Sequence, residues 1–178
     1  MNKSLFALVL TLGLGSLASV HAQQAPAAPA INDAQIAHIA YTAGAIDVTA
    51  AKQALNKSHN KAVIGFAREM ARDHAAVNDQ ALALAKKLGV TPADNATSQS
   101  LAKGAAAEQT KLAALSGAAY DRAYAANEVA FHKAVLAALD GTLIPATQNA
   151  ELKSLLETGS KLFHEHQMHA EHLAASLK

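Results

Sequence analysis

Histidine is concentrated near the carboxyl end of the chain. The stretch FHEHQMHAEH, residues 163–172, holds four histidines, two glutamates and one methionine. Imidazole is the commonest neutral metal ligand in proteins, and its charge changes near pH 6.5, so the stretch suits a metal site or a proton-sensitive surface. Helical spacing divides the four histidines. It places His166 and His169 on the apolar stripe, His164 away from it and His172 at its flank.

Three histidines, each in a different predicted helix, are candidates for a buried site. His74, His132 and His166 lie near the middle of their helices, on or beside the apolar stripe. Helical bundles build metal sites from side chains on facing helices. Convergence of the three would therefore hold Zn, Cu or Fe. The acids that could complete or orient this site are Asp73, Asp121 and Glu128.

A buried histidine does not by itself indicate a metal. Its ring nitrogens can pair with hydroxyl, carboxylate or carbonyl groups, and Tyr41, Tyr120 and Tyr124 are candidate partners in such a structural network. A third interpretation is an acid sensor, because burial lowers the pKa of histidine and protonation would then open the bundle. Spacing alone leaves all three interpretations open.

The histidine-rich stretch also offers a candidate surface site. His169 and His172 are three residues apart and Glu165 precedes His169 by four, so the three can meet on one helix face. Such a trio suits Cu or Ni, and the neighbouring Met168 suits Cu(I). The alternative is an ordinary solvated last helix without a site.

Some kinds of chemistry are disfavoured by the sequence. A standard di-iron site in a helical bundle uses Glu-x-x-His on two helices, and no glutamate here is followed by histidine three residues later. The chain has no cysteine, no Gly-x-Ser-x-Gly motif and no glycine-rich phosphate loop. The sequence therefore disfavours an enzyme, and the cofactor it leaves open is a divalent metal.

Composition and periodicity predict an all-α protein. Alanine is abundant and aromatic residues are few, which is typical of helices. Ser116 is expected to begin the second part of a broken third helix, and Gly141 and Pro145 to end it. The predicted helical regions are residues 33–56, 61–88, 99–139 with a break at 116–117, and 146–177. They predict an antiparallel four-helix bundle, with a dimerising helical hairpin as the alternative.

The amino-terminal residues predict export. Lys3, an apolar run over residues 5–14 and the small-residue pattern at residues 20–22 are typical of a signal peptide, residues 1–22, cleaved near Ala22. A Pro/Ala-rich spacer, residues 23–31, precedes the bundle domain, residues 32–178. We expect a periplasmic or secreted protein without a transmembrane segment in the mature chain.

The net charge of the predicted mature chain indicates which class of partner is disfavoured. Without Lys3 the mature chain has 14 basic and 14 acidic residues. A net charge of zero disfavours nucleic acid as a partner. A protein partner or self-association stays open.

Three segments resemble a known family. They are FAREMARDHAAVN (Phe66–Asn78), AYDRAYAANEVAFHKAVL (Ala119–Leu136) and LFHEHQMHAEHL (Leu162–Leu173). They resemble the exported bacterial proteins of domain of unknown function 4142, which are grouped with the ferritin-like folds. The matching marks are the Asp73-His74 pair, Asp121 with Tyr124 and His132, and His166. The resemblance implies a ferritin-like four-helix bundle outside the cytoplasm, with no established activity.

This chain departs from the family pattern at several positions. Tyr120 stands where the family often has Phe, and a proline common before the last family histidine is missing. His164, His169 and His172 are additions without a family role. The function predicted first is a non-enzymatic structural, binding or envelope-stress role around a buried His/Asp/Tyr cluster. The alternatives are a metal-binding protein and an acid-sensing binder.

Overall fold

The computed structural model describes residues 31–177, and the predicted signal peptide and most of the spacer lie outside them. All regular structure in the described residues is helical, which confirms the all-α prediction for this part of the chain. The elements are α1 (Asp33–Lys57), α2 (Lys61–Leu88), α3 (Ala96–Ala113), α4 (Gly117–Ala138), the π-helix η1 (Leu139–Leu143), α5 (Ile144–Ala146) and α6 (Ala150–Ser176).

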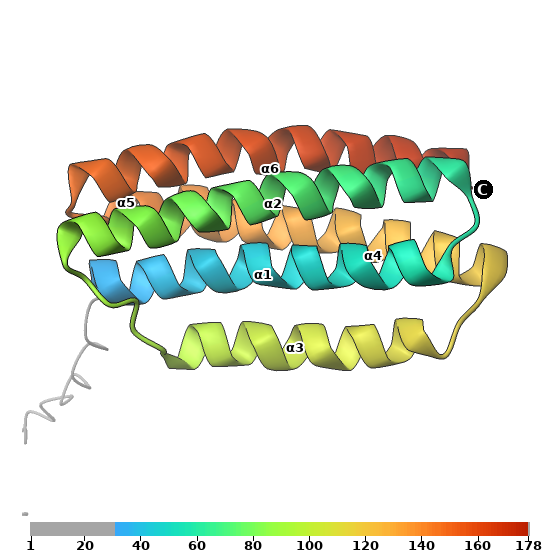
Figure 1. Cartoon of the computed structure of the whole chain (residues 1–178), viewed down its shortest axis with the longest axis horizontal. Coiled ribbons are helices and arrows are strands. Elements are labelled where there is room, and N and C mark those ends of the chain that lie inside the picture. Colours follow the sequence, from blue (N-terminus) through green and yellow to red (C-terminus); the bar gives the residue numbers. More distant parts are fainter. Residues whose placement is uncertain (1–30, 178) are drawn as a thin grey trace, which may run out of the picture.

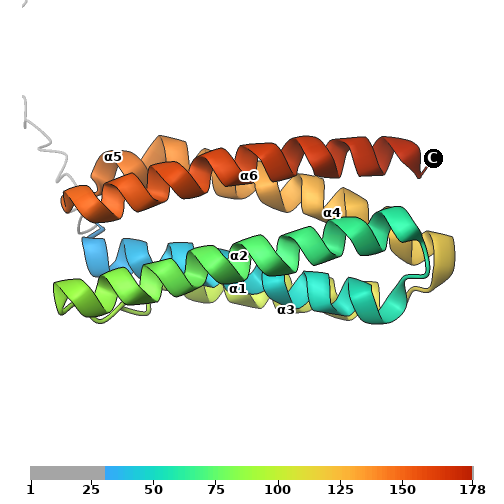
Figure 2. The same cartoon turned by 45° about the horizontal axis from the view of Figure 1, so that its top comes forward.

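The long helices lie side by side along one axis (Figure 1). The colours show α1, α3 and α6 running in one direction and α2 and α4 in the other. α1 packs mainly on α2, and α4 packs mainly on α6. α3 lies against α1 and makes few contacts with α4 (Figure 2). The third predicted helical region is therefore two separate helices, and its first part lies outside the group formed by α1, α2, α4 and α6.

Asparagine side chains begin four of the helices. Asn32, Asn60, Asn95 and Asn149 precede α1, α2, α3 and α6, and each side-chain oxygen accepts from backbone N–H groups in the first turn. Such caps satisfy donors that the helix itself leaves free. Gly89 ends α2 with a φ of 65°, a left-handed conformation that favours glycine.

One carboxylate joins the beginnings of the first and last long helices. The backbone N–H of Gln148 donates to Asp33 Oδ1 at 2.9 Å, and that of Asn149 donates to Asp33 Oδ2 at 2.7 Å. Asp33 thus fixes the chain just before α6 begins.

One predicted helix boundary is confirmed and another is wrong. α4 begins directly after Ser116, as predicted, although the Ser116 side chain makes no capping hydrogen bond. Gly141 and Pro145 do not end the fourth helix, because the chain continues through η1 and α5 to Ala146, and α6 begins only at Ala150. Proline is tolerated here because it lies in the first turn of α5, where its missing N–H is not needed.

By length and composition alone, one stretch of the described chain, Gly117–Ala146, could cross a membrane. The expectation of a mature chain without a transmembrane segment therefore stays a prediction. A core helix meets the same criterion, and this one carries the buried polar side chains of Asp121, Glu128 and His132. The stretch is therefore only weak support for a membrane span.

The interior consists of two apolar halves separated by a polar layer. The first half, which we call the tyrosine half, includes Ala54, Met70, Tyr120, Tyr124 and Leu173. The second half, which we call the leucine half, includes Ile36, Leu136, Leu139, Leu152 and Phe163. The polar layer between them places titratable side chains at the middle of the bundle.

Candidate metal centre

The polar layer draws one or two buried side chains from each of four helices. Asp47 comes from α1, His74 from α2, Glu128 and His132 from α4, and His166 from α6. None of these residues is more than 1% exposed. Each occupies the helical position where an apolar side chain would otherwise fill the core, so the layer replaces packing with polar groups.

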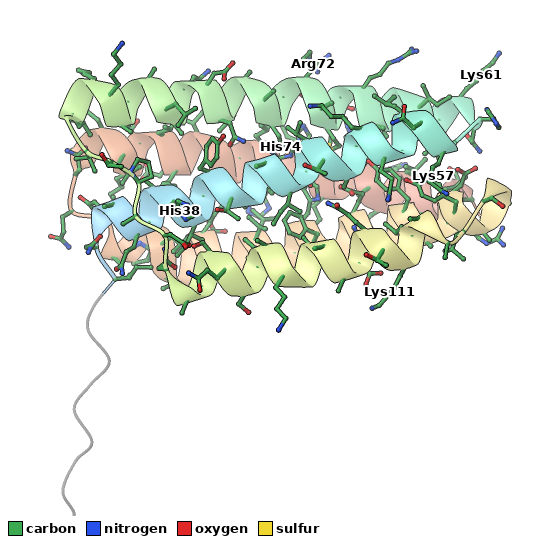
Figure 3. All side chains as sticks on the ribbon, turned by 60° about the horizontal axis from the view of Figure 1, so that its bottom comes forward. His38, Lys57, Lys61, Arg72, His74 and Lys111 are labelled. Carbon is green, nitrogen blue, oxygen red and sulfur yellow. The ribbon has the colours of Figure 1, made fainter. Side chains whose placement is uncertain are left out.

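The three histidines converge. His166 Nδ1 lies 3.1 Å from His74 Nε2, and the His132 ring centroid is 5.7 Å from that of His74 and 5.9 Å from that of His166. One nitrogen from each ring lies within 4.8 Å of the other two. Figure 3 shows His74 pointing between the helices, whereas Arg72 lies on the outer side of α2.

Two carboxylates face the histidines. His74 Nε2 lies 3.4 Å from Asp47 Oδ2, and His132 Nδ1 lies 3.8 Å from Glu128 Oε2. Asp47, Glu128 and His132 form a second set whose candidate ligand atoms lie within 4.8 Å of one another. The two sets share His132, so nitrogen and oxygen donors surround one volume of the core.

Hydrogen bonds fix the protons of two of the rings. His132 Nδ1 lies 2.9 Å from the backbone oxygen of Glu128. A carbonyl only accepts, so Nδ1 carries the proton and Nε2 presents a free lone pair. His166 Nε2 lies 3.3 Å from Asp73 Oδ2. The same reasoning leaves His166 Nδ1 as the lone pair that faces His74.

Several acceptor atoms of the layer have no hydrogen-bond partner in the described part of the chain. Among residues 31–177, its buried atoms without a hydrogen-bond partner are Asp47 Oδ1, Asp47 Oδ2, Glu128 Oε2 and His132 Nε2. The approach of His74 Nε2 to Asp47 does not satisfy that carboxylate, since it lacks hydrogen-bond geometry. Buried polar atoms are nearly always paired. Four neighbouring acceptors therefore require protons or a cation.

Burial controls the charges in the layer. It lowers the pKa of His74 to about 2 and that of His132 to about 4, with neighbouring histidines adding to the effect. It raises the pKa of Glu128 to about 8 and holds that of Asp47 well above its usual range, with Glu128 adding to the latter shift. At neutral pH without a cation, the rings are neutral and Glu128 retains a proton.

The other predicted site residues lie outside this layer. Asp121 accepts a hydrogen bond of 2.6 Å from the Ser58 hydroxyl, which ties α4 to the chain between α1 and α2. Asp73 pairs with Arg72 and with the outer nitrogen of His166. The placement of His169 on the buried stripe is wrong, because its side chain is 56% exposed.

The predicted surface trio is spread along α6. His169 Nδ1 lies 3.2 Å from Glu69 Oε1 on α2, and Glu165 and His172 are exposed. His169 is thus engaged by a residue of another helix, which a search along one helix does not detect.

Sequence reasoning missed Asp47 and Phe163. The signal for Asp47 was present, since it follows Ala43 by four residues and precedes Ala50 by three on the buried stripe of α1. The ring of Phe163 packs on the layer, with its centroid 4.7 Å from that of His74 and 5.2 Å from that of His132. Phe163 also lines a cavity of about 1250 Å³ in the leucine half.

The family model described as Domain of unknown function (DUF4142) matches residues 18–173. The chain belongs to this family. Neither the comparison with curated proteins nor that with solved structures gives a match. The polar layer is the feature of this DUF4142 protein that points to a function.

Proposed function

We propose that this DUF4142 protein binds a divalent first-row transition-metal ion in its polar layer. The observation that carries the proposal is the group of four buried, unpartnered acceptor atoms on Asp47, Glu128 and His132. A purely structural network would pair these atoms with donors. A cation satisfies all of them together.

The distances suit direct coordination. Bonds of about 2.1 Å at tetrahedral angles separate neighbouring ligand atoms by about 3.4 Å. The His74 nitrogen lies 3.1 Å from the His166 nitrogen and 3.4 Å from an Asp47 oxygen. Small side-chain movements would then complete the ligand set with His132 and Glu128. Mixed imidazole and carboxylate donors suit Zn and Fe, and imidazole also suits Cu.

The residues around the layer would orient its ligands. Metal-bound histidines usually donate their other N–H to a carbonyl or carboxylate. His132 donates to the Glu128 carbonyl, and His166 donates to Asp73. Both rings thus direct their free nitrogen inward. This role for Asp73 supports a metal site even though Asp73 lies outside the layer.

The proposal includes an antiparallel ferritin-like four-helix bundle formed by α1, α2, α4 and α6, in a protein exported after cleavage near Ala22. Facing helices of such bundles supply ligands to metals in their core. The donors differ from the di-iron pattern, because α1 contributes Asp47 and α4 contributes Glu128 and His132 four residues apart.

The test is elemental analysis of the untagged protein followed by Zn²⁺ titration in competition with a chelator. We expect tight binding at the polar layer in the wild type and its loss in His132→Ala. His172→Ala is the matched control, because it removes an exposed histidine from the same protein. Tight binding that survives His132→Ala, or that is missing in the wild type, would refute the proposal. Circular dichroism shows whether each variant is folded.

A further inference from the structure

A second group of candidate ligands lies between α2 and α6, beside the polar layer. Glu69, Asp73 and His166 offer atoms within 4.8 Å of one another. The exposed His169 adds a ring nitrogen 3.2 Å from Glu69 Oε1. The side chains of Glu69 and Asp73 are 31% and 21% exposed. This outer group therefore reaches solvent, whereas the polar layer does not.

We propose that Glu69, Asp73 and His169 form an outer cation site, from which a divalent metal ion passes to the polar layer beside His166. The inference rests on the proposed function, since it supplies the route by which the buried centre is loaded. The ligand class is the same, a divalent first-row transition metal held by mixed imidazole and carboxylate donors.

His166 connects the two sites. Its Nε2 faces Asp73 Oδ2 at 3.3 Å, and its Nδ1 faces His74 Nε2 at 3.1 Å. The two nitrogens of this one ring therefore face opposite sites, and the residue is only 1% exposed. An ion held by the outer group would be separated from the polar layer by this single ring.

The leucine half offers no comparable route. The Phe163 ring lines the cavity and packs on the rings of His74 and His132. The cavity lining is mostly apolar, and its carboxylates, Asp33 and Glu108, are engaged by backbone N–H groups and by Lys111. Among residues 31–177, the α2–α6 side therefore offers a hydrated cation carboxylate and imidazole ligands next to the polar layer, which the cavity does not.

Arg72 competes for the outer site. Its guanidinium donates to both oxygens of Asp73, at 2.6 and 2.9 Å, and its own side chain is 71% exposed. It thus supplies positive charge where the metal ion would bind. Arg72→Gln should strengthen the outer site, whereas Arg68→Gln, which removes an exposed arginine one turn away, should leave it unchanged.

The decisive experiment uses the full mature chain with Zn²⁺ as the probe. Equilibrium dialysis measures stoichiometry, and rapid mixing with a fluorescent chelator measures uptake. We expect a weaker second equivalent in the wild type. Glu69→Gln/His169→Gln should lose it and should slow uptake into the polar layer, with the tight equivalent retained. Glu165→Gln/His172→Gln is the control, with the same changes at exposed positions of α6.

The outcomes separate the two proposals. The outer site is refuted if the wild type binds one Zn²⁺ tightly but no second Zn²⁺. It is also refuted if the control variant shows the same losses as Glu69→Gln/His169→Gln. Either result leaves the proposal of the buried centre intact. Loss of the second equivalent without slower uptake overturns the loading role. A wild type that binds no Zn²⁺ overturns both proposals.

Discussion

The tyrosine half and the leucine half of the bundle are built from the same helices but are filled differently. In the tyrosine half, Tyr120 and Tyr124 stack with centroids 6.1 Å apart, and both are fully buried together with Met70. The leucine half contains the cavity of about 1250 Å³, bordered by the exposed alanines of α4. Side chains beside a void lose contacts on one side. Stability is therefore unequal along the axis, with the polar layer at the boundary.

The largest expected effect contrasts one core residue from each half. Met70→Ala removes a fully buried side chain from the tyrosine half and should cost about 4 kcal/mol of unfolding free energy. Leu139→Ala, beside the cavity, should cost about 2 kcal/mol, since part of its surface has no packing partner. Urea unfolding monitored by circular dichroism measures both. Equal losses would mean that the leucine half is as tightly packed as the other.

The second-largest expected effect concerns the proton on Glu128, which lies in the polar layer between the two halves. Without metal, the folded protein keeps a proton on Glu128, whose pKa is about 8 against an ordinary 4.5. The resulting stabilisation is complete below pH 4.5 and is lost as pH rises through 8, because the unfolded chain has already released the proton. Wild type should therefore lose on the order of 2 kcal/mol relative to Glu128→Gln between about pH 6 and pH 7.5.

Thermal melts in the presence of a chelator across this pH range test the prediction. Glu157→Gln, at an exposed position of α6, is the control and should run parallel to the wild type. The acid side has the opposite sign. The lowered pKa of His132, about 4, stabilises the fold above pH 6.5, and this contribution is lost as pH falls. A difference in stability between Glu128→Gln and the wild type that does not change with pH would contradict the proton assigned to Glu128.

The smallest effect uses two glycines. A Cβ on Gly159, beside the cavity, would meet no atom within 4 Å, so Gly159→Ala should stabilise α6 by about 0.5–1 kcal/mol. A Cβ on Gly44 would lie 2.4 Å from Asn78 Oδ1. Gly44→Ala should therefore destabilise the α1–α2 contact. The melting temperatures of the two variants test both predictions. A higher melting temperature in both would show that Asn78 moves into the cavity without loss of stability.

Periodicity predicted the direction of some side chains and missed others. It predicted that His74, His132 and His166 point inward, and all three are buried. It missed Asp47, because an apolar stripe was traced through apolar residues alone, and a buried acid interrupts such a stripe. His169 lies three residues beyond His166, at the edge of the buried face of α6, where a small rotation of the helix decides exposure.

Other features depend on contacts between helices. The sequence did not show that α3 packs on α1 rather than between α4 and its neighbours. The contact between α3 and α1 includes hydrogen bonds between residues that are far apart in sequence. Gln53 donates to the Gln109 carbonyl, and Lys57 donates to the Ala113 carbonyl. The pairing of Glu69 with His169 likewise joins two helices. Helical spacing predicts which way a side chain points but not which neighbour it meets.

The carboxylate of Asp33 has a consequence for the order of assembly. It belongs to the first turn of α1, yet it holds the chain where α6 begins, 115 residues later. In a chain synthesised from its amino end, this carboxylate therefore lacks its two donors until Gln148 and Asn149 have been made. The polar layer shares this dependence, because His166 is among its last parts to arrive. Metal capture and completion of the fold would then be one late event rather than two successive ones.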